Sequence, residues 1–405
     1  MQNENNELNF PPNFLWGCST SAHQIEGGLT NDWSEWEKSH HRLEELKNQN
    51  KNPLDYISGQ AANSFLDNNA DIVCMKELGL NAYRFSVDWS RIEPQPGIFD
   101  ETALNYYLNF IKSLRAHGIE PFVTLWHWPV PLWIRDIGGW ESPKIVEYFN
   151  RFVKKTAGHL NTEVNFWITL NEPMVYSGNS YMVGIWPPQK KNFISYYKVI
   201  KKLIKAHRLA FDTLKEIDSD NKVGIAKHNI YFEAFGNKLI NRILKFFADW
   251  WINERFLKAI DDKQDFIGLN YYFHNKINYG FSRQHEYEKK SDLNWGLHPE
   301  GIYYLLKDLK KYNKPIYITE NGLADRGDQH RSWYINEILK NVHHAIKEGT
   351  DVKGYFHWSL IDNFEWAEGF HPKFGLYEVD YKNFDRIARP SAQFYQDVCK
   401  NNRII

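Results

Sequence analysis

A regular alternation of short apolar segments and amphipathic helical segments restricts the fold of this chain more than any other feature. The apolar segments are rich in β-branched and aromatic residues, and most are continuous runs, which is typical of strands buried on both faces of a parallel sheet. Eight such segments occur: Phe14–Cys18, Ala82–Val87, Pro121–Trp126, Asn165–Leu170, Lys222–Ala226, Phe266–Asn270, Pro315–Thr319 and Gly354–Trp358.

Helical patterns with a 3.6-residue period separate these segments. Asp67–Leu78 ends at Gly79 and Thr102–His117 ends at Gly118, and glycine suits the left-handed position that ends a helix. The other helical stretches are Lys144–His159, Ser195–Ile217, Phe246–Ile260, Gly301–Lys311, Arg331–Glu348 and Ser391–Cys399. Eight strand–helix units predict an α/β fold, a (β/α)8 TIM barrel. The alternative is a doubly wound open sheet, but no glycine-rich phosphate loop follows an early strand.

No linker, low-complexity tract or shift in composition divides the chain, so we expect a single domain over residues 1–405, with residues 1–10 as a flexible tail. The acidic N-terminus has neither the basic nor the apolar region of a signal peptide. No run of about 18 apolar residues is present, so we expect no membrane span and no membrane partner. The three cysteines match no metal motif and favour a reducing compartment, which predicts a cytoplasmic location.

The balance of charge excludes one large class of partners. The chain carries 49 basic and 50 acidic residues, whereas nucleic-acid-binding proteins usually have a basic excess. Four lysines gather at Lys198, Lys201, Lys202 and Lys205, and we interpret them as the solvated face of a helix. No nucleic-acid partner is predicted, and nothing in the sequence indicates an oligomeric state.

Polar and aromatic residues gather where the predicted strands end, which is where barrel enzymes hold their chemistry. Six strands are followed directly by such residues: Asp88–Ser90, His127–Trp128, Asn171–Pro173, Asn270–Tyr272, Glu320–Gly322 and, at the eighth strand, Trp358. Any one of these residues alone is readily explained as a loop or capping residue. Six coincident strand ends favour a functional site at this end of the barrel.

Two glutamates are the centre of the functional prediction. Glu172 and Glu320 each follow an apolar strand directly, and a barrel lets them face each other across its mouth. Glycoside hydrolysis uses two carboxyl groups on either side of the sugar: one protonates the leaving oxygen, and the other attacks or activates a water. Tryptophan is also frequent, with 16 residues, and indole rings cover the apolar faces of sugars.

Longer motifs carry a resemblance to a known family. In chain order these are Phe14–Gly17, Ser21–Gly27, Tyr83–Ser86, Thr124–Trp128, Thr169–Pro173, Gly268–Tyr272, Ile318–Gly322 and the segment Trp358–Tyr381. They resemble the motifs of glycoside hydrolase family 1, the β-glucosidase and β-glycosidase family. The resemblance runs from Phe14 to about Tyr395, nearly the whole chain.

The resemblance implies a role for each matching residue. Glu172 is implied as the general acid/base and Glu320 as the nucleophile of a retaining reaction, in which the carboxyl groups lie about 5–5.5 Å apart. The negative charge of Glu320 is expected to raise the pKa of Glu172. The implied substrate-binding residues are Gln24, His127, Asn171, Trp358, Glu365, Trp366, Trp128 and Phe374, and the implied supports of Glu320 are Arg84, Asn270 and Tyr272.

The family's activity is expected to follow. This is a retaining exo-β-glycosidase that removes non-reducing-end β-D-glucosyl residues, with galactosyl or fucosyl as further candidates, from β-glucosides and short β-linked oligosaccharides. No cofactor and no metal are predicted. A transglycosidase that uses the same intermediate and a non-catalytic sugar-binding protein stay as alternatives. Phosphorylated sugars are disfavoured, because a Glu365 anion would repel phosphate.

The remaining tryptophans are less well assigned, and so is the leaving-group side. The chain is shorter than most of the family after the fifth strand and between Tyr272 and Pro315, which leaves the aglycone preference open. His23 stands where many relatives carry Tyr or Phe and receives no role. We expect four further tryptophans near the mouth: Trp126, Trp133, Trp186 and Trp295. Three others, Trp250, Trp251 and Trp333, fall in helical stretches and have no functional explanation.

Overall fold

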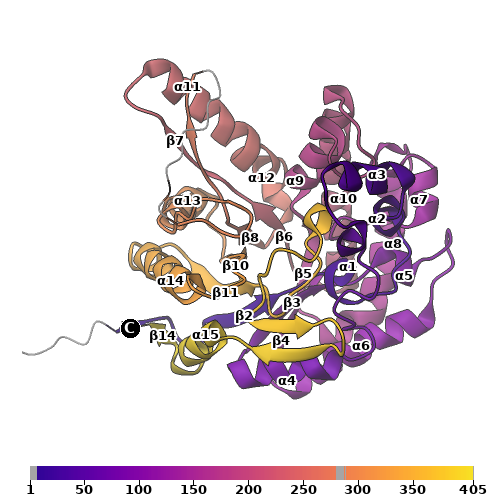
Figure 1. The fold of residues 1–405 in the computed structure, drawn as a ribbon, viewed down its shortest axis with the longest axis horizontal. Helices are drawn as coiled ribbons and strands as arrows, with labels where there is room; N and C mark the ends of the chain where they lie inside the picture. The colour runs from indigo at the N-terminus through magenta and orange to yellow at the C-terminus, as the bar shows by residue number, and fades with distance from the viewer. Residues whose placement is uncertain (1–6, 280–286, 288, 405) are drawn as a thin grey trace, which may run out of the picture.

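The computed structural model describes residues 7–279, 287 and 289–404. Its centre is a closed barrel of eight parallel strands, which confirms the predicted (β/α)8 fold (Figure 1). In ring order the strands are β2 (Leu15–Ser19), β3 (Ala82–Ser86), β4 (Glu120–Thr124), β5 (Phe166–Asn171), β6 (Lys222–His228), β8 (Phe266–Asn270), β10 (Ile316–Asn321) and β11 (Val352–Trp358). β11 pairs with β2 and closes the ring, and every strand overlaps a predicted segment.

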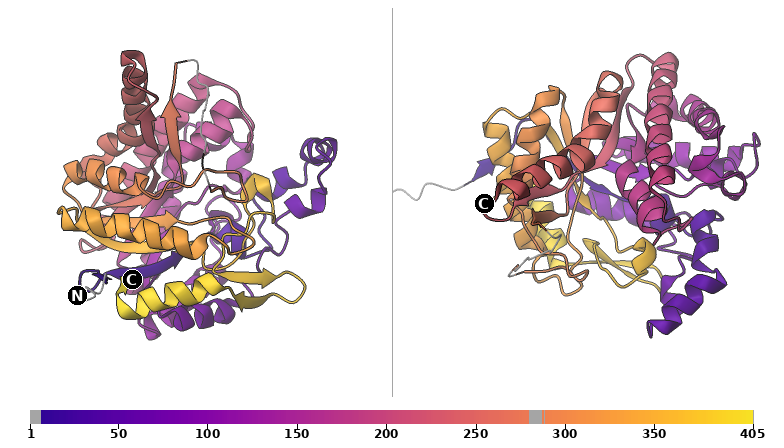
Figure 2. Two further views of the ribbon diagram at one scale, coloured as in Figure 1. Left: turned by 60° about the vertical axis from the view of Figure 1, so that its left-hand side comes forward. Right: turned by 90° about the horizontal axis from the view of Figure 1, so that it is seen from above.

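Helices surround the barrel, as the views in Figures 1 and 2 show. They are α4 (Asn68–Leu78), α6 (Glu101–Ala116), α8 (Ile145–Leu160), α10 (Phe193–Ile217), α11 (Leu239–Ala248), α12 (Arg255–Ile260), α13 (Gly301–Leu309), α14 (Arg331–Lys347) and α15 (Pro390–Asn401). Gly79 and Gly118 adopt left-handed backbone angles after α4 and α6, as predicted. One expected helix differs: Phe246–Ile260 lies in α11 and α12, which the π-helix η5 (Asp249–Glu254) joins.

Short helices fill the connections, and they are too short to show a helical period in the sequence. They are α1 (Ala22–Ile25), α2 (Asp32–Glu37), α3 (His40–Asn48), α5 (Trp89–Ile92), α7 (Leu132–Asp136), α9 (Pro173–Ser177), η1 (Pro53–Tyr56), η2 (Gly139–Glu141), η3 (Asn161–Glu163), the π-helix η4 (Gly178–Val183), η6 (Asp261–Lys263), η7 (Lys310–Tyr312) and η8 (Trp366–Glu368). Among the described helices, none combines the length and the apolar character that a membrane crossing needs.

Three two-stranded sheets lie outside the barrel. They are β7 (Tyr231–Ala234) with β9 (His274–Ile277), β12 (Tyr377–Asp380) with β13 (Asp385–Ala388), and β1 (Leu8–Asn9) with β14 (Arg403–Ile404). The last pair differs from the tail expected over residues 1–10. β1 is fixed by its partner strand, and Phe10 is buried against Trp16 because an aromatic ring gains by leaving water. Residues 1–6 lie outside the described part of the chain.

The interior of the barrel is filled with aromatic rings below the mouth. Phe122 stacks on Phe166 at 4.2 Å between ring centroids and contacts Phe266, Tyr317 and Phe356 edge-on. These side chains belong to one buried cluster separate from the helix-facing core. Because the lower barrel is packed solid, the open space lies at the carboxyl ends of the strands.

Candidate active site

A pocket enclosing about 220 Å³ opens at the carboxyl ends of the strands. Nine of the side chains predicted for the site line it: His127, Trp128, Glu172, Tyr272, Glu320, Trp358, Glu365, Trp366 and Phe374. The other four, Gln24, Arg84, Asn171 and Asn270, lie behind this lining and hydrogen-bond to it. The structure therefore brings all thirteen predicted side chains together, nine in the pocket lining and four directly behind it.

Glu320 is the last residue but one of β10 and is held from two sides. The guanidinium of Arg84 donates from Nη1 to Glu320 Oε1, and the Tyr272 hydroxyl donates to Oε2 over 3.1 Å. Arg84 is completely buried and is itself fixed by a bond from Nε to Thr124 Oγ1 of 3.1 Å. A buried cation and a hydroxyl at the two oxygens favour the charged form of this carboxyl group and aim it.

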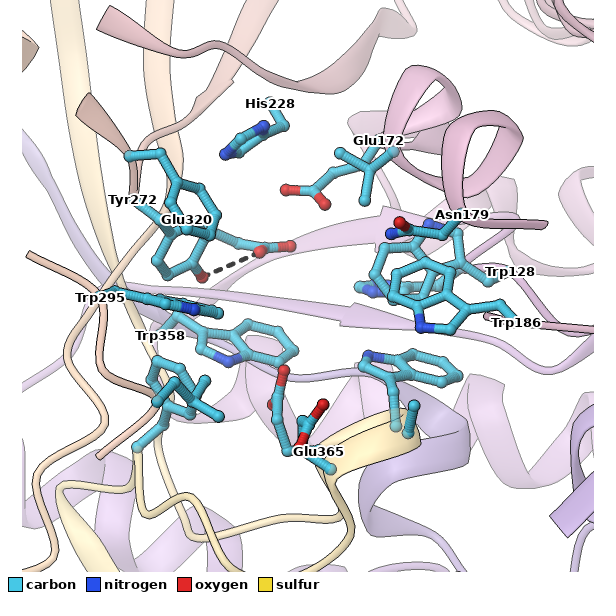
Figure 3. A pocket seen from close by; sticks show the side chains of 18 of the residues that line it. Trp128, Glu172, Asn179, Trp186, His228, Tyr272, Trp295, Glu320, Trp358 and Glu365 are labelled. Atoms are coloured by element: carbon cyan, nitrogen blue, oxygen red, sulfur yellow. Dashed lines mark hydrogen bonds between the residues drawn. The ribbon is translucent and has the colours of Figure 1, made fainter. Parts of the chain in front are cut away.

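Glu172 follows β5 and receives a different kind of support. Asn270 donates from Nδ2 to Glu172 Oε1 over 2.8 Å, and no cation bonds to this carboxyl group among the described residues. Figure 3 shows Glu172 and Glu320 pointing toward each other across the pocket. The two carboxyl groups therefore share a cavity but differ in what holds them.

The backbone at three lining residues is strained. Glu172, Trp128 and Trp366 have φ angles of 44°, 87° and 51°, a region that side chains with a Cβ rarely occupy. Such angles persist only where the surrounding structure enforces them, and they gather at functional sites. The strain at these positions serves to turn the side chains into the pocket.

Burial sets the protonation of the pair. It raises the pKa of Glu172 to about 8, and the charge of Glu320 adds a second, smaller effect. The expected effect of the Glu320 charge is therefore present, but burial is the larger cause. Burial also raises the pKa of Glu320, but there Arg84 and Tyr272 oppose the rise. Because only Glu320 contacts a cation, its surroundings favour its ionised form more than those of Glu172 do, so it ionises first.

Asn171 connects the two layers. Its Oδ1 accepts from Arg84 Nη2 over 2.7 Å, which orients the amide so that Nδ2 donates to His127 Nε2 over 2.8 Å. The neutral imidazole then carries its proton on Nδ1, since Nε2 accepts. His127 Nδ1 is buried and bonds to no group in the described part of the chain, so it is left to serve a ligand hydroxyl.

Glu365 closes the far side of the pocket. Gln24 donates from Nε2 to Glu365 Oε2 over 3.3 Å and to Asn363 Oδ1 over 2.9 Å. Burial raises the pKa of Glu365 to about 8, with the neighbouring carboxylates of Glu320 and Glu368 adding to the effect. These surroundings disfavour the Glu365 anion on which the argument against phosphorylated sugars rests.

A stack of aromatic rings supports the same side. Trp366 lies nearly parallel to His127 and to His23, with centroids 5.8 and 5.4 Å apart. His23 in turn bonds from Nε2 to Glu37 Oε1 over 2.8 Å. His23 had no predicted role. The buried Glu37 of α2 fixes its ring, and the ring packs against Trp366 and holds it in place.

The four tryptophans expected near the mouth divide evenly. Trp186 and Trp295 line the pocket, as expected. Trp126 and Trp133 do not: Trp126 is buried against Trp140, and Trp133 bonds to a backbone carbonyl outside the pocket. Trp126 lies two residues after the end of β4, where alternation can direct a side chain to the helix layer as readily as to the mouth.

Eight lining residues were not predicted, among them the polar side chains His228 and Asn179. His228 ends β6 and lines the pocket beside Tyr272, with ring centroids 6.2 Å apart, and Asn179 of η4 lies opposite (Figure 3). The strand predicted here ends at Ala226, two residues before the end of β6 at His228. Extending the strand-end rule by two residues finds His228, whereas Asn179 leaves no sequence signal because it lies in a π-helix.

Gly322 follows β10 directly and lies against Trp358 at the end of β11. A Cβ at Gly322 would lie 1.6 Å from the backbone oxygen of Trp358, so no other residue fits without moving one of the two strands. This close approach is a physical reason for glycine two residues after Glu320.

Metal-ligating side chains come together at one place among the described residues, outside the pocket. Glu233, His274 and His298 have ligand atoms within 4.8 Å of one another, and His274 Nε2 lies 3.1 Å from Glu233 Oε2. Here His274 contacts Glu233, and His298 packs on the His274 ring with centroids 3.9 Å apart. Within the pocket the carboxyl groups face Arg84, Asn270 and Gln24 instead.

The fold and the pocket together define a class. A (β/α)8 barrel that holds two facing carboxyl groups amid tryptophans at the carboxyl ends of its strands is typical of a glycoside hydrolase. The sequence profile of Glycosyl hydrolase family 1 matches residues 6–256 and 238–404. The chain belongs to this family and is a glycoside hydrolase of the β-glucosidase type.

Individual relatives agree over the full length. Beta-glucosidase A of Thermotoga maritima is 33% identical over 447 aligned residues, which cover 98% of this chain and 99% of the relative. The solved family 1 β-glucosidase from Thermotoga maritima superposes with a TM-score of 0.92 at 31% identity and covers 99% of this chain and 100% of that chain. The same enzyme in complex with glucoimidazole superposes with a TM-score of 0.91 at 31% identity, covering 98% and 100%.

Proposed function

We propose that the chain is a retaining exo-β-glycosidase that removes β-D-glucosyl residues from the non-reducing ends of β-glucosides and short β-linked oligosaccharides. The observation that carries this proposal is the unequal support of the two carboxyl groups. Glu320 bonds to a buried cation and a hydroxyl, whereas Glu172 bonds only to an amide. The unequal support assigns Glu320 as the nucleophile and Glu172 as the general acid/base.

In the first step Glu172 gives its proton to the glycosidic oxygen while Glu320 attacks the anomeric carbon. The bond to the leaving group breaks, and a covalent glycosyl-enzyme forms. Esterification removes the charge of Glu320, so one of the two causes of the raised Glu172 pKa disappears. Glu172 then takes a proton from water, and the water oxygen replaces Glu320 at the anomeric carbon.

The polar groups around the pair fit a single sugar ring. His127 Nδ1 and the Gln24–Glu365 pair offer hydrogen bonds for the outer hydroxyls, and Trp358 offers an apolar surface for the ring. Asn171, between Arg84 and His127, is assigned to the 2-hydroxyl. The glucoimidazole complex of the relative supports a glucose-shaped glycone, and galactosyl or fucosyl groups differ in only one or two hydroxyls. A cytoplasmic location stays a prediction that rests on cysteine usage.

Two variants test the assignment of the carboxyl groups. Glu172→Ala with an activated aryl β-glucoside should lose the base of the second step, and added azide should restore turnover and yield a β-glycosyl azide. Glu320→Ala should be inactive with every leaving group, because no covalent intermediate forms. Azide that rescues Glu320→Ala but not Glu172→Ala would reverse the two roles.

The anomer of the first product tests the retaining mechanism. Proton NMR during hydrolysis should show β-glucose before mutarotation, whereas α-glucose as the first product would exclude a covalent intermediate. The same intermediate can also pass to an alcohol. The ratio of alkyl glucoside to glucose at rising alcohol concentration measures whether transglycosylation is the main reaction.

A further inference from the structure

Helix α11 exposes an apolar face to solvent. Leu239, Phe246 and Phe247 are 71%, 64% and 56% exposed, and Ile240 and Ile243 are more than one third exposed. Soluble proteins scatter single apolar residues over the surface but rarely gather this many large ones on three turns of helix. A face of this kind indicates a surface that is covered when the protein is at work.

The exposed face continues beyond α11. The rings of Trp250 and Trp251 in η5 lie 5.8 Å apart, and Trp251 stacks on Phe193 at the start of α10 with centroids 6.2 Å apart. Phe193 and its neighbour Ile194 are more than half exposed. We call this surface the apolar rim: Phe193, Ile194, Leu239, Ile240, Ile243, Phe246, Phe247 and Trp250. The rim includes Trp250, one of the three tryptophans that had no functional explanation.

The apolar rim lies at the same end of the barrel as the pocket. α10 and α11 both begin after the carboxyl ends of barrel strands, β5 and β6, where the pocket opens. Ile185, which lines the pocket, is half exposed, as are Met182 and Val183 of η4. In Figure 1, α11 projects outward from the barrel at the upper left together with β7.

Basic residues accompany the rim. The segment 238–248 contains Lys238, Arg242 and Lys245 and no acidic residue, and residues 193–205 contain four lysines and no acidic residue. Asp249 pairs with Lys245 at 2.6 Å and is the nearest acid that follows α11 in the chain. A helix with Phe, Leu and Ile on one face and cations on the other is typical of helices that lie in a membrane interface.

We propose that the apolar rim binds the surface of a lipid bilayer that carries anionic headgroups, beside the entrance of the pocket. The rim would enter the boundary of headgroups and acyl chains. The exposed Lys238 and Arg242, with Lys198, Lys201 and Lys205 of α10, would pair with anionic headgroups. A second copy of the chain is the competing occupant, but it would bring the same basic residues against each other, and like charges oppose such a contact. The absence of a membrane partner was predicted from the lack of a spanning segment, and a surface of this kind needs no such segment.

Vesicle flotation with the full-length enzyme tests the proposal. The probes are vesicles of phosphatidylcholine alone and of phosphatidylcholine with phosphatidylglycerol. The wild type should float with both kinds and more strongly with the anionic vesicles. The double variant Phe246→Ser/Phe247→Ser should reduce the vesicle-bound fraction about tenfold, because two exposed rings no longer enter the interface. Lys238→Glu/Arg242→Glu should abolish the preference for anionic vesicles.

The matched control is Leu66→Ser/Ile387→Ser. Leu66 is 78% and Ile387 53% exposed, but they lie on or beside α4 and β13, far along the chain from the rim. This variant should bind vesicles as the wild type does, and all variants should hydrolyse a small aryl β-glucoside at the wild-type rate. An enzyme that hydrolyses the glucoside but floats with neither vesicle overturns only this proposal. So does a dimer in sedimentation that Phe246→Ser/Phe247→Ser converts to monomer without any vesicle binding.

Discussion

The two halves of the pocket are built on different principles. In the inner half, made of Arg84, His127, Asn171, Glu320 and Glu365, each side chain hydrogen-bonds to another protein side chain. The outer wall is made of Asn179, Trp186, His228, Phe273 and Trp295, and ring contacts predominate there. Phe273 lies 4.5 Å from Trp295 and 5.5 Å from His228 between ring centroids, whereas Trp186 packs on Trp128 at 4.5 Å. A network fixes one hydroxyl pattern, whereas packed rings accept many apolar groups. We infer that the glycone is selected strictly and the leaving group loosely.

The largest effect is expected from Arg84→Met in the inner half. The substitution leaves the Glu320 carboxyl group without its cation and Asn171 Oδ1 without its donor, both in buried surroundings. We expect kcat/KM for an aryl β-glucoside to fall about 10²- to 10³-fold. Because the cation lowers the Glu320 pKa, its removal should also move the acid limb of the pH profile to higher pH.

The control for this variant is Arg135→Met, which removes an arginine whose side chain is 41% exposed and pairs with Asp136. It should change kcat/KM by less than about twofold, because exposed ion pairs contribute little. An acid limb that stays in place in Arg84→Met would mean that the arginine acts only through packing.

The pH profile itself distinguishes the two carboxyl groups of the pair. Glu172 must carry its proton for the first step, and its pKa is raised to about 8. Activity should therefore be present below this pKa and should fall as the pH rises through about 8, as measured by kcat/KM of the free enzyme. With an activated leaving group, which needs no proton, Glu172→Gln should lose this alkaline limb. A limb that persists in Glu172→Gln would assign it to another group.

A side chain at Gly322 is expected to destabilise the protein, because the strand ends at the inner half of the pocket are closely packed. Gly322→Ala forces a Cβ against the Trp358 carbonyl oxygen, so one strand end must move. We expect a loss of about 2–3 kcal/mol in the free energy of unfolding, measured by urea denaturation. Gly158→Ala is the matched control, since it lies in α8 with no atom within 4 Å of the added Cβ. It should leave stability unchanged or raise it by about 0.5–1 kcal/mol.

The difference between the inner half and the outer wall also explains which residues of the pocket could be predicted from the sequence. Inner residues such as Arg84, Asn171 and Glu320 lie within barrel strands or at their ends, so the strand pattern and the motifs locate them together. The alternation of side chains along a strand then determines which of them enter the mouth. The eight strands therefore follow from the sequence pattern, and the motifs name the residues that line the glycone side. The hydrogen bond between Gln24 and Glu365 was not predicted.

The outer wall lacks such a pattern. Trp186 and Trp295 lie in loops, and Asn179 lies in a π-helix, so no period relates their position in the chain to a direction in space. Trp126 and Trp186 have the same side chain, yet only Trp186 reaches the pocket. The direction of loop residues depends on tertiary packing, which the local sequence does not express. The apolar rim escaped prediction for a related reason, because helix α11 begins seven residues before the helix expected there.

The smallest effect is expected from His228 in the outer wall. Its Nε2 is buried and bonds to no group within the described residues, and burial lowers the pKa of the imidazole to about 3, so the ring is neutral. A neutral ring whose nitrogen lies at the outer wall is suited to one hydrogen bond with a leaving group.

The variant His228→Phe keeps an aromatic ring at this position and removes the nitrogen. We expect kcat/KM for a β-linked disaccharide to fall about three- to tenfold, the loss of one hydrogen bond. For an aryl β-glucoside, whose leaving group offers little to bind, kcat/KM should stay within twofold. Equal losses for both substrates would place His228 in the glycone network and erase the division between the two halves.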